Sequence, residues 1–277
     1  MPDFTIFYSW QMDAPERINK AFVQNALNAA VQDLGNEFTV EPADRITVDQ
    51  GMKGVPGSPE IATMMFEKIG ESAIYVGDIS LVGEVRRNGE QVKKVPNPNV
   101  NIEEGFAAGV LGWERVICVA NTYFGTNEEQ SVDQRNRRYP ISYRLHPHAN
   151  KKALAKAALE LREDLKAAIE TVKKYELRRA ETTLGALDIR SIELVGLYRN
   201  APSFPQPLTN NPQGPIEALR DLALWNRCIV RLLELRLLRT NLGVSTGGAA
   251  LYAYHWTTLG MKVGELISKK TTTAEPV

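Results

Sequence analysis

The first 176 residues alternate between short apolar runs and longer stretches in which apolar residues recur every three or four positions. The short runs predict strands, and the longer stretches predict helices. The runs at 73–76 and 116–120 are continuously apolar, which is typical of parallel strands covered on both faces. Further strands are expected at 4–8, 38–40 and 141–145, and helices at 18–34, from 58, from 97 and at 150–175. This order predicts an α/β fold with an open, mainly parallel sheet.

The pattern changes after residue 176. Residues 177–214 contain Pro202, Pro205, Pro207 and Pro212 and predict a linker with one short element at 192–198. Residues 215–269 carry two apolar helical patterns joined by a short turn, which predicts a helical hairpin used for assembly or for docking a partner. Its first helix is apolar on more than one face, which suggests self-association. Residues 270–277 are expected to form a disordered tail.

Charge and composition exclude several classes of protein. The chain has 33 basic and 33 acidic residues, so no net charge favours nucleic acid or an anionic membrane. Cys118 and Cys228 lie among apolar neighbours and are expected to be reduced, and the three histidines show no metal spacing. Residues 241–261 carry no charge, but their hydroxyls, glycines and histidine favour a soluble helix over a membrane span. Without a secretory signal, we expect a cytoplasmic protein.

The stretch NPNVNIEEGFAAG, residues 97–109, places two adjacent acids in an otherwise apolar helix. Asn97 can cap this helix and Pro98 can occupy its first turn, so Glu103 falls in the second turn. Ligands of open α/β sheets bind beyond the carboxyl ends of the strands, where this helix begins. A carboxylate there could stabilise the positive charge that develops when an N-glycosidic bond breaks. Glu103 and Glu104 could equally be acids favoured by the helix dipole.

Four segments in the same order resemble bacterial TIR-like (Toll/interleukin receptor-like) proteins: FYSWQMD (7–13), GSPEI (57–61), NPNVNIEEGFAAG with LGWERVICVAN (97–109 and 111–121), and VDQRNRRYPISY (132–143). The resemblance covers about residues 4–175. It implies a flavodoxin-like sheet, cleavage of NAD at the nicotinamide–ribose bond, and a role in antiviral defence. The family pattern puts the catalytic glutamate on Glu103. Glu104 stands where that pattern is usually apolar, which leaves exchanged roles open. The pattern is also similar to nucleoside 2-deoxyribosyltransferases.

The resemblance and the positions of strand ends together define the expected function. We expect an assembly-activated NAD glycohydrolase that needs no cofactor or metal, with Glu103 as the catalytic residue. TIR enzymes generally need neighbouring copies to complete the site, so a homo-oligomer is expected, with a defence-complex partner as a further possibility. A non-catalytic nucleotide-binding or assembly module and a deoxyribosyltransferase are the alternatives. Substrate-binding residues are expected at strand ends and at the helix start: Ser9, Trp10, Gln11, Asp44, Arg45, Asp78 and Asn99.

The aromatic and basic members of this set also have structural interpretations. Trp10 follows the first predicted strand, so its ring could stack on a base or belong to the core. Arg45, in a glycine-containing loop at 44–57, could contact a pyrophosphate or pair with Asp44. The arginines at 135, 137 and 138 have acidic neighbours, which favours an ion-pair cluster over nucleic-acid binding.

Overall fold

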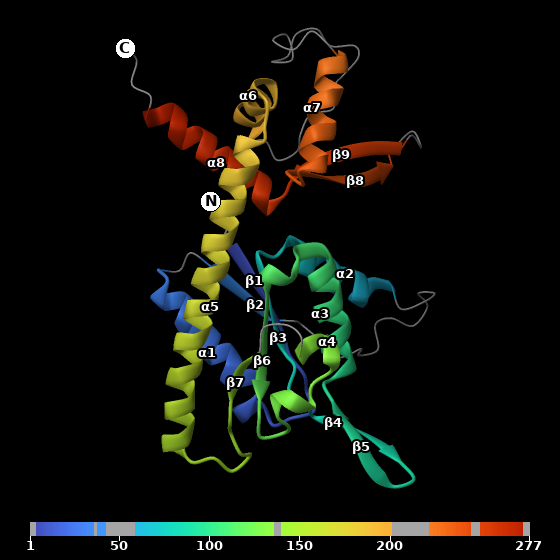
Figure 1. Ribbon diagram of the computed structural model, residues 1–277, viewed down its shortest axis with the longest axis vertical. Helices are drawn as coiled ribbons and strands as arrows, with labels where there is room; N and C mark the ends of the chain where they lie inside the picture. Colours follow the sequence, from blue (N-terminus) through green and yellow to red (C-terminus); the bar gives the residue numbers. More distant parts are fainter. Residues whose placement is uncertain are drawn as a thin grey trace. The chain divides into compact units, whose positions relative to one another are not determined.

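The computed structural model describes residues 4–35, 38–42, 59–135, 140–200, 222–244 and 250–273 (Figure 1). The chain divides into two compact units, residues 1–172 and 173–277. The predicted boundary was residue 176, so the division falls slightly earlier and lies within a helix.

A five-stranded sheet forms the centre of the first unit. Its strands are β1 (Phe4–Ser9), β2 (Phe38–Pro42), β3 (Ile74–Asp78), β6 (Val116–Asn121) and β7 (Ile141–Tyr143). Their order is β2-β1-β3-β6-β7, and every pair of neighbours is parallel. The predicted α/β fold with a parallel sheet is therefore confirmed.

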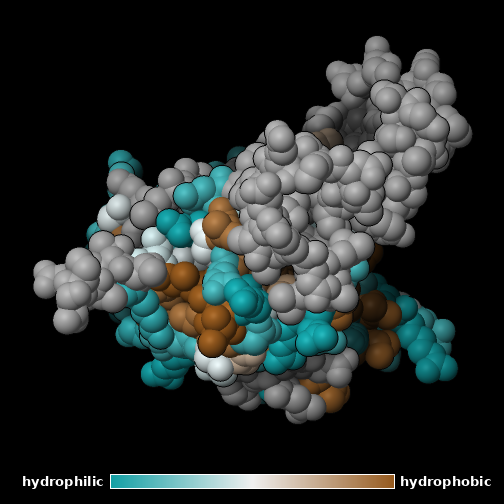
Figure 2. Space-filling model, turned by 90° about the horizontal axis from the view of Figure 1, so that it is seen from above, coloured by the Kyte–Doolittle hydropathy of each residue, from teal (hydrophilic) through white to brown (hydrophobic). Residues whose placement is uncertain are grey.

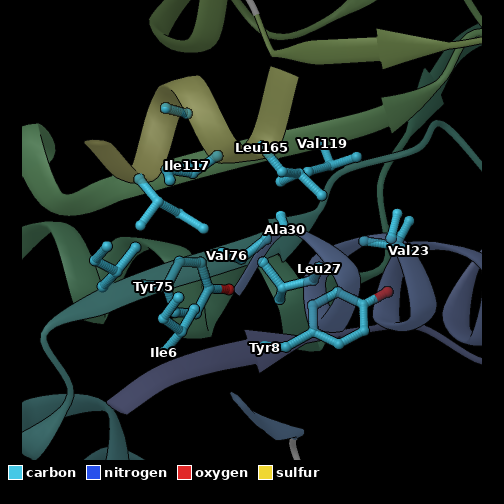
Figure 3. Packing of buried hydrophobic residues seen from close by; sticks show 14 of the residues in the cluster. Ile6, Tyr8, Val23, Leu27, Ala30, Tyr75, Val76, Ile117, Val119 and Leu165 are labelled. Atoms are coloured by element: carbon cyan, nitrogen blue, oxygen red, sulfur yellow. The ribbon is translucent and has the colours of Figure 1, made fainter. Parts of the chain in front are cut away.

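Helices cover both faces of this sheet (Figure 1). α1 (Lys20–Asp33) and α5 (Lys151–Gly185) lie on one side, and α2 (Pro59–Glu71) and α3 (Pro98–Leu111) on the other. Consecutive β1 residues Ile6, Phe7 and Tyr8 have no exposed surface, although they point to alternate faces. Figure 3 shows Val23, Leu27 and Ala30 of α1, and Leu165 of α5, packed against the strands. Burial on both faces explains why the strands are apolar without alternation.

A protruding β-hairpin joins β3 to α3. Its strands are β4 (Gly83–Arg87) and β5 (Glu90–Val95), which pair antiparallel and separately from the main sheet. The turn residues Asn88 and Gly89 both have positive φ, 52° and 84°, as a type I′ turn requires. The sequence pattern above did not predict this hairpin. The Asn-Gly pair was the available signal for the hairpin.

Short helical segments complete the first unit. They are η1 (Glu16–Ile18), η2 (Trp113–Arg115), η3 (Asn127–Glu129) and α4 (Val132–Arg135). Lys94 of the hairpin lies 3.2 Å from the Glu129 carboxylate, so one hairpin strand is tied to the η3 segment. Figure 2 shows hydrophobic areas interspersed with hydrophilic ones on the described surface of the face drawn. Several large apolar side chains are exposed, among them Met12, Ile102 and Val132.

The second unit differs from the predicted linker and helical hairpin. α5 continues through the start of the expected linker to Gly185, because Ala180 and Leu184 extend its buried stripe. α6 (Ile189–Tyr198) then includes the short element expected at 192–198. The remainder of the linker, 201–214, lies outside the described residues.

The predicted helical hairpin is wrong, because two strands separate its helices. α7 (Leu222–Glu234) is followed by β8 (Leu238–Val244), β9 (Ala250–Trp256) and α8 (Thr258–Thr273). β8 and β9 pair antiparallel from Leu238–Trp256 to Val244–Ala250. Two tyrosines and a tryptophan at alternate positions of β9 favour a strand, and this alternation competed with the helical spacing used for the prediction. Residues 270–273, expected in the disordered tail, end α8, whereas 274–277 lie outside the described residues.

A separate apolar cluster holds the second unit together. Leu194 and Val195 of α6 are fully buried with Leu232 of α7 and Val263 of α8. Among the described residues of both units, no helix is long and apolar enough to span a membrane.

Candidate active site

The helix that carries the two acids begins at a well-formed cap. The Asn97 side chain accepts hydrogen bonds from the backbone N–H groups of Asn99, at 2.9 Å, and Val100, at 3.4 Å, and Pro98 follows at the first helical position. The only charged residues of α3, Glu103 and Glu104, are 8% and 4% exposed, whereas its apolar Ile102 is 59% exposed. α3 therefore buries its acids and exposes an aliphatic side chain, the reverse of an ordinary surface helix.

The sheet presents a row of small and polar residues on the α3 side. Ser9 of β1 pairs with Gly77 of β3, and Gly77 pairs with Cys118 of β6. Tyr75 lies two residues before Gly77, so its side chain emerges on the same face. A Cβ on Gly77 would lie 2.8 Å from Tyr75 Cε1 and 3.1 Å from the Tyr75 hydroxyl. The missing side chain at Gly77 thus makes room for the tyrosine ring between Ser9 and Cys118.

Glu103 is held by the end of β1. Ser9 Oγ donates a short hydrogen bond to Glu103 Oε2, and Ser9 itself has no exposed surface. The Tyr75 hydroxyl donates to the carbonyl oxygen of Val100 at 3.3 Å, which attaches the first turn of α3 to β3. Burial raises the pKa of the Tyr75 hydroxyl well above its ordinary value, and the nearby charge of Glu103 adds to this effect, so the phenol stays neutral.

Glu104 has a different set of neighbours. Cys118 Sγ donates to Glu104 Oε1 at 3.2 Å, and Gln134 Nε2 of α4 donates to Glu104 Oε2 at 2.9 Å. The two consecutive carboxylates of α3 therefore have different hydrogen-bond partners. The first is bound to β1, and the second to β6 and α4.

Asp78 is the centre of a buried polar network rather than an exposed strand-end acid. Its carboxylate accepts hydrogen bonds from Asn19 Nδ2 at 2.9 Å, Gln11 Nε2 at 3.4 Å, Ser80 N at 3.1 Å and Ser80 Oγ at 2.5 Å. Burial raises the pKa of Asp78, and these hydrogen bonds oppose the shift. Ser80 Oγ also accepts from the backbone N–H of Asn121 at 2.8 Å, so the network joins the ends of β3 and β6.

A chain of polar contacts connects this network to the cap of α3. Gln11 Oε1 accepts from the backbone N–H of Asp13 at 2.6 Å, and Asp13 Oδ2 accepts from Asn97 Nδ2 at 2.5 Å. The turn after β1 is thereby attached at one end to Asp78 and at the other to the residue that caps the Glu103 helix.

The other predicted substrate ligands lie in varied surroundings. Trp10 belongs to the buried core, with Lys20 Nζ 3.8 Å from its ring centroid. Asn99 is exposed in the first turn of α3. Asp44 and Arg45 lie outside the described residues, as does the whole loop 44–57. Ser9, Gln11 and Asp78 have no exposed surface in this structure. Direct substrate contact by any of these residues stays a prediction.

Sequence reasoning did not single out Tyr75, Gly77, Cys118 or Gln134 as neighbours of the two acids. Tyr75 and Cys118 belong to continuous apolar strands, where nothing in the pattern tells the faces apart. A glycine two residues after a buried tyrosine was the one usable signal, because glycine inside a strand often marks a close approach.

The structure also bears on metals and disulfides. Among the described residues, no group of three or more His, Cys, Asp or Glu side chains could hold a metal ion. Cys118 and Cys228 form no disulfide. No protein-family model matches this sequence, and a search of curated proteins finds no significant match.

Proposed function

We propose that the protein is an NAD glycohydrolase in which Glu103 acts on the nicotinamide ribose. The observation that carries this proposal is a carboxylate that is slightly exposed, fixed by Ser9, and placed by α3 against the end of β1. The sequence resemblance to TIR-like proteins supplies the substrate class.

The strand order supports this location for a ligand. In chain order the five sheet strands lie as 2-1-3-4-5, the order of flavodoxin-like doubly wound sheets. Such sheets bind ligands at the switch point, where the chain changes direction across the sheet between the first and third strands. Ser9 and Tyr75 come from these two strands, β1 and β3, and the Ser9 hydroxyl binds Glu103 directly.

The chemistry needs one anionic group beside the anomeric carbon. As the bond between ribose C1′ and the nicotinamide nitrogen breaks, its electron pair neutralises the pyridinium and leaves positive charge on the ribose. The carboxylate of Glu103 stabilises that charge, water adds to C1′, and a proton is released. The products are nicotinamide and ADP-ribose.

Incubation of the purified full chain with NAD tests the proposal, with products separated by chromatography. The assay is run with dilute protein and with protein clustered by a crowding agent, because TIR-like enzymes act after assembly. We expect nicotinamide release from clustered protein and a fall of about 10²–10³-fold in Glu103→Gln. Full turnover in Glu103→Gln would remove the assignment.

Glu104→Gln is the matched control. Glu104 is the adjacent residue on the same helix and is also buried, but it is bound to Cys118 and Gln134 instead of Ser9. We expect this variant to retain most activity. Loss in Glu104→Gln with activity kept in Glu103→Gln would show that the two acids exchange roles.

One alternative is a non-catalytic module that binds a nucleotide or assembles with partners. The burial of Ser9, Gln11 and Asp78 agrees with an assembly role, because none of these predicted ligand contacts is accessible in this structure. Tight NAD binding without nicotinamide release, even in clustered protein, would support that alternative. Base exchange on deoxynucleosides with no action on NAD would instead indicate a deoxyribosyltransferase. As an antiviral effector, the wild-type chain should deplete cellular NAD during phage infection, and Glu103→Gln should not.

A further inference from the structure

We infer that Ser9 and Tyr75 are positioning residues for Glu103, with Gly77 providing the space that lets them act together. This inference rests on the proposed function for its catalytic meaning. It assigns Ser9 a role different from substrate contact, and it gives Tyr75 a role that the sequence did not suggest.

Ser9 lies buried at the end of β1, beside Glu103. A serine with no exposed surface has no access to a ligand in this structure, yet its hydroxyl donates to Glu103 Oε2. One carboxylate oxygen is thus occupied by a fixed donor from the end of β1. The orientation of the other oxygen is restricted as a consequence, since the two oxygens share one plane. A short side chain on a buried strand is a rigid support for such a bond.

Tyr75 attaches α3 to the sheet. Glu103 can be placed accurately only if the first turns of α3 are fixed relative to the sheet. The Tyr75 hydroxyl donates to the carbonyl oxygen of Val100, one turn before Glu103. Because the ring passes through the space at Gly77, the tyrosine reaches α3 from the middle of the Ser9–Gly77–Cys118 row.

Different hydrogen-bond partners hold the two adjacent acids apart. Cys118 and Gln134 occupy both oxygens of Glu104, so this carboxylate is drawn toward β6 and α4. Ser9 draws Glu103 toward β1. The row on the sheet therefore distinguishes two neighbouring glutamates that the helix alone would present together.

The first experiment compares Ser9→Ala with Ser72→Ala. Ser72 is also a buried serine beside β3, but its hydroxyl donates to the Ile69 carbonyl oxygen at 2.8 Å. In the clustered NAD assay we expect kcat of Ser9→Ala to fall by about 10–100-fold with a small change in KM, because misplacement of a catalytic group costs rate rather than binding. Ser72→Ala should keep the wild-type kcat.

A pH profile separates positioning from a loss of folded protein. A hydroxyl that donates to a carboxylate favours its charged form, so removing Ser9 should move the acid limb of kcat to higher pH. The other ionisable groups facing this site are Glu104 on α3, Tyr75 on β3 and Cys118 on β6, and none of them is replaced in Ser9→Ala. Ser9 also hydrogen-bonds to Tyr75, but burial holds the pKa of the Tyr75 hydroxyl well above its ordinary value, so this group does not contribute to the acid limb. A fall in folded protein would lower kcat at every pH without moving the limb.

Tyr75→Phe gives a second variant that keeps the ring in the core. We expect a loss of about 3–10-fold in kcat, since one hydrogen bond to α3 is removed. Tyr143→Phe is its control, because Tyr143 is a buried sheet tyrosine whose hydroxyl donates to the Ile18 carbonyl oxygen at 2.8 Å. Equal effects of the two substitutions would overturn the role of Tyr75.

Carboxyl ¹³C NMR makes the test independent of the proposed function. Protein labelled at the glutamate carboxyl carbons is titrated as wild type, Ser9→Ala and Ser72→Ala, with Glu103 assigned by its absence in Glu103→Gln. The inference requires a higher titration midpoint for Glu103 in Ser9→Ala only. An unchanged midpoint overturns it, whether or not the protein cleaves NAD. Inactive Glu103→Gln together with wild-type behaviour of Ser9→Ala would leave the proposed function standing and remove the positioning role.

Discussion

Replacing Gly77 by alanine should destabilise the first unit, because the new methyl group has no space. Its Cβ would lie 2.8 Å from Tyr75 Cε1, and the tyrosine ring is fully buried. The ring cannot move outward without disturbing its hydrogen bond to Val100, so the sheet or α3 must shift. Overpacking of this kind costs about 1–3 kcal/mol. For a unit of this size, that corresponds to a fall in Tm of about 2–12 °C.

Thermal unfolding followed by circular dichroism measures this change, with Gly109→Ala as the control. Gly109 lies within α3, and a Cβ built there meets no atom within 4 Å. Alanine in place of an exposed helical glycine should raise stability by about 0.5–1 kcal/mol. Replacing glycine by alanine should therefore lower the free energy of unfolding at position 77 and raise it at position 109.

A double-mutant cycle identifies the cause. Tyr75→Leu shortens the side chain that the new methyl group would meet, so Gly77→Ala should cost less in that background by about 0.5–3 kcal/mol. Tyr75→Phe keeps the ring and should give no such relief. The steric argument is refuted if Gly77→Ala has the same Tm as the wild type. It is also refuted if Gly77→Ala lowers the free energy of unfolding by the same amount in the Tyr75→Leu background.

Three further changes test the interactions described above. Asp78→Ala should cost about 2–5 kcal/mol in urea unfolding, because the buried donors of Asn19 and Ser80 lose their acceptor. Since burial raises the pKa of Asp78, the folded state binds its proton more tightly than the unfolded state does. The resulting contribution to the free energy of unfolding is complete below the unfolded pKa and is lost as pH rises through the folded pKa. The free energy of unfolding of the wild type, measured relative to Asp78→Asn, should therefore fall with rising pH, and a constant difference would contradict this reasoning. Asp188→Ala removes the side chain that caps α6 by accepting from Ser191 N at 2.9 Å, and it should cost about 0.5–2 kcal/mol by thermal unfolding, whereas Asp188→Ser should keep most of the cap. Leu232→Ala should lower the free energy of unfolding of the second unit by about 2–5 kcal/mol, measured by hydrogen exchange of α7 amides, because Leu232 is fully buried there.

The sequence predicted the parallel sheet well because its strands are covered on both faces. The runs at 74–78 and 116–121 are almost entirely apolar, and no helix-period pattern competes with them. The prediction for the second unit failed because its sequence pattern is ambiguous. The residues of β8 and β9 combine apolar spacing compatible with a helix and aromatic alternation compatible with a strand, and pairing between the two strands decides between them.

The candidate site was predictable only in part. The Asn-Pro start of α3 fixed Glu103 in the second turn, because a cap and a first-turn proline are local features. Strand-end positions correctly placed Gln11 and Asp78 near each other, as their hydrogen bond shows. The sequence could not show that these side chains turn inward, because the Asp78 carboxylate is bound by Asn19, which arrives from a distant segment, as well as by the adjacent Ser80.

The β4–β5 hairpin, together with the state of the two cysteines, makes the protein well suited to site-specific labelling. Neither thiol is exposed: Cys228 is buried, and Cys118 is half-buried and donates a hydrogen bond to the Glu104 carboxylate. The hairpin tip at Glu90 is exposed, and the hairpin strands do not pair with those of the main sheet in the described structure. A single cysteine introduced there should accept a maleimide fluorophore against a low background, giving an optical probe on the segment that leads directly into the Glu103 helix.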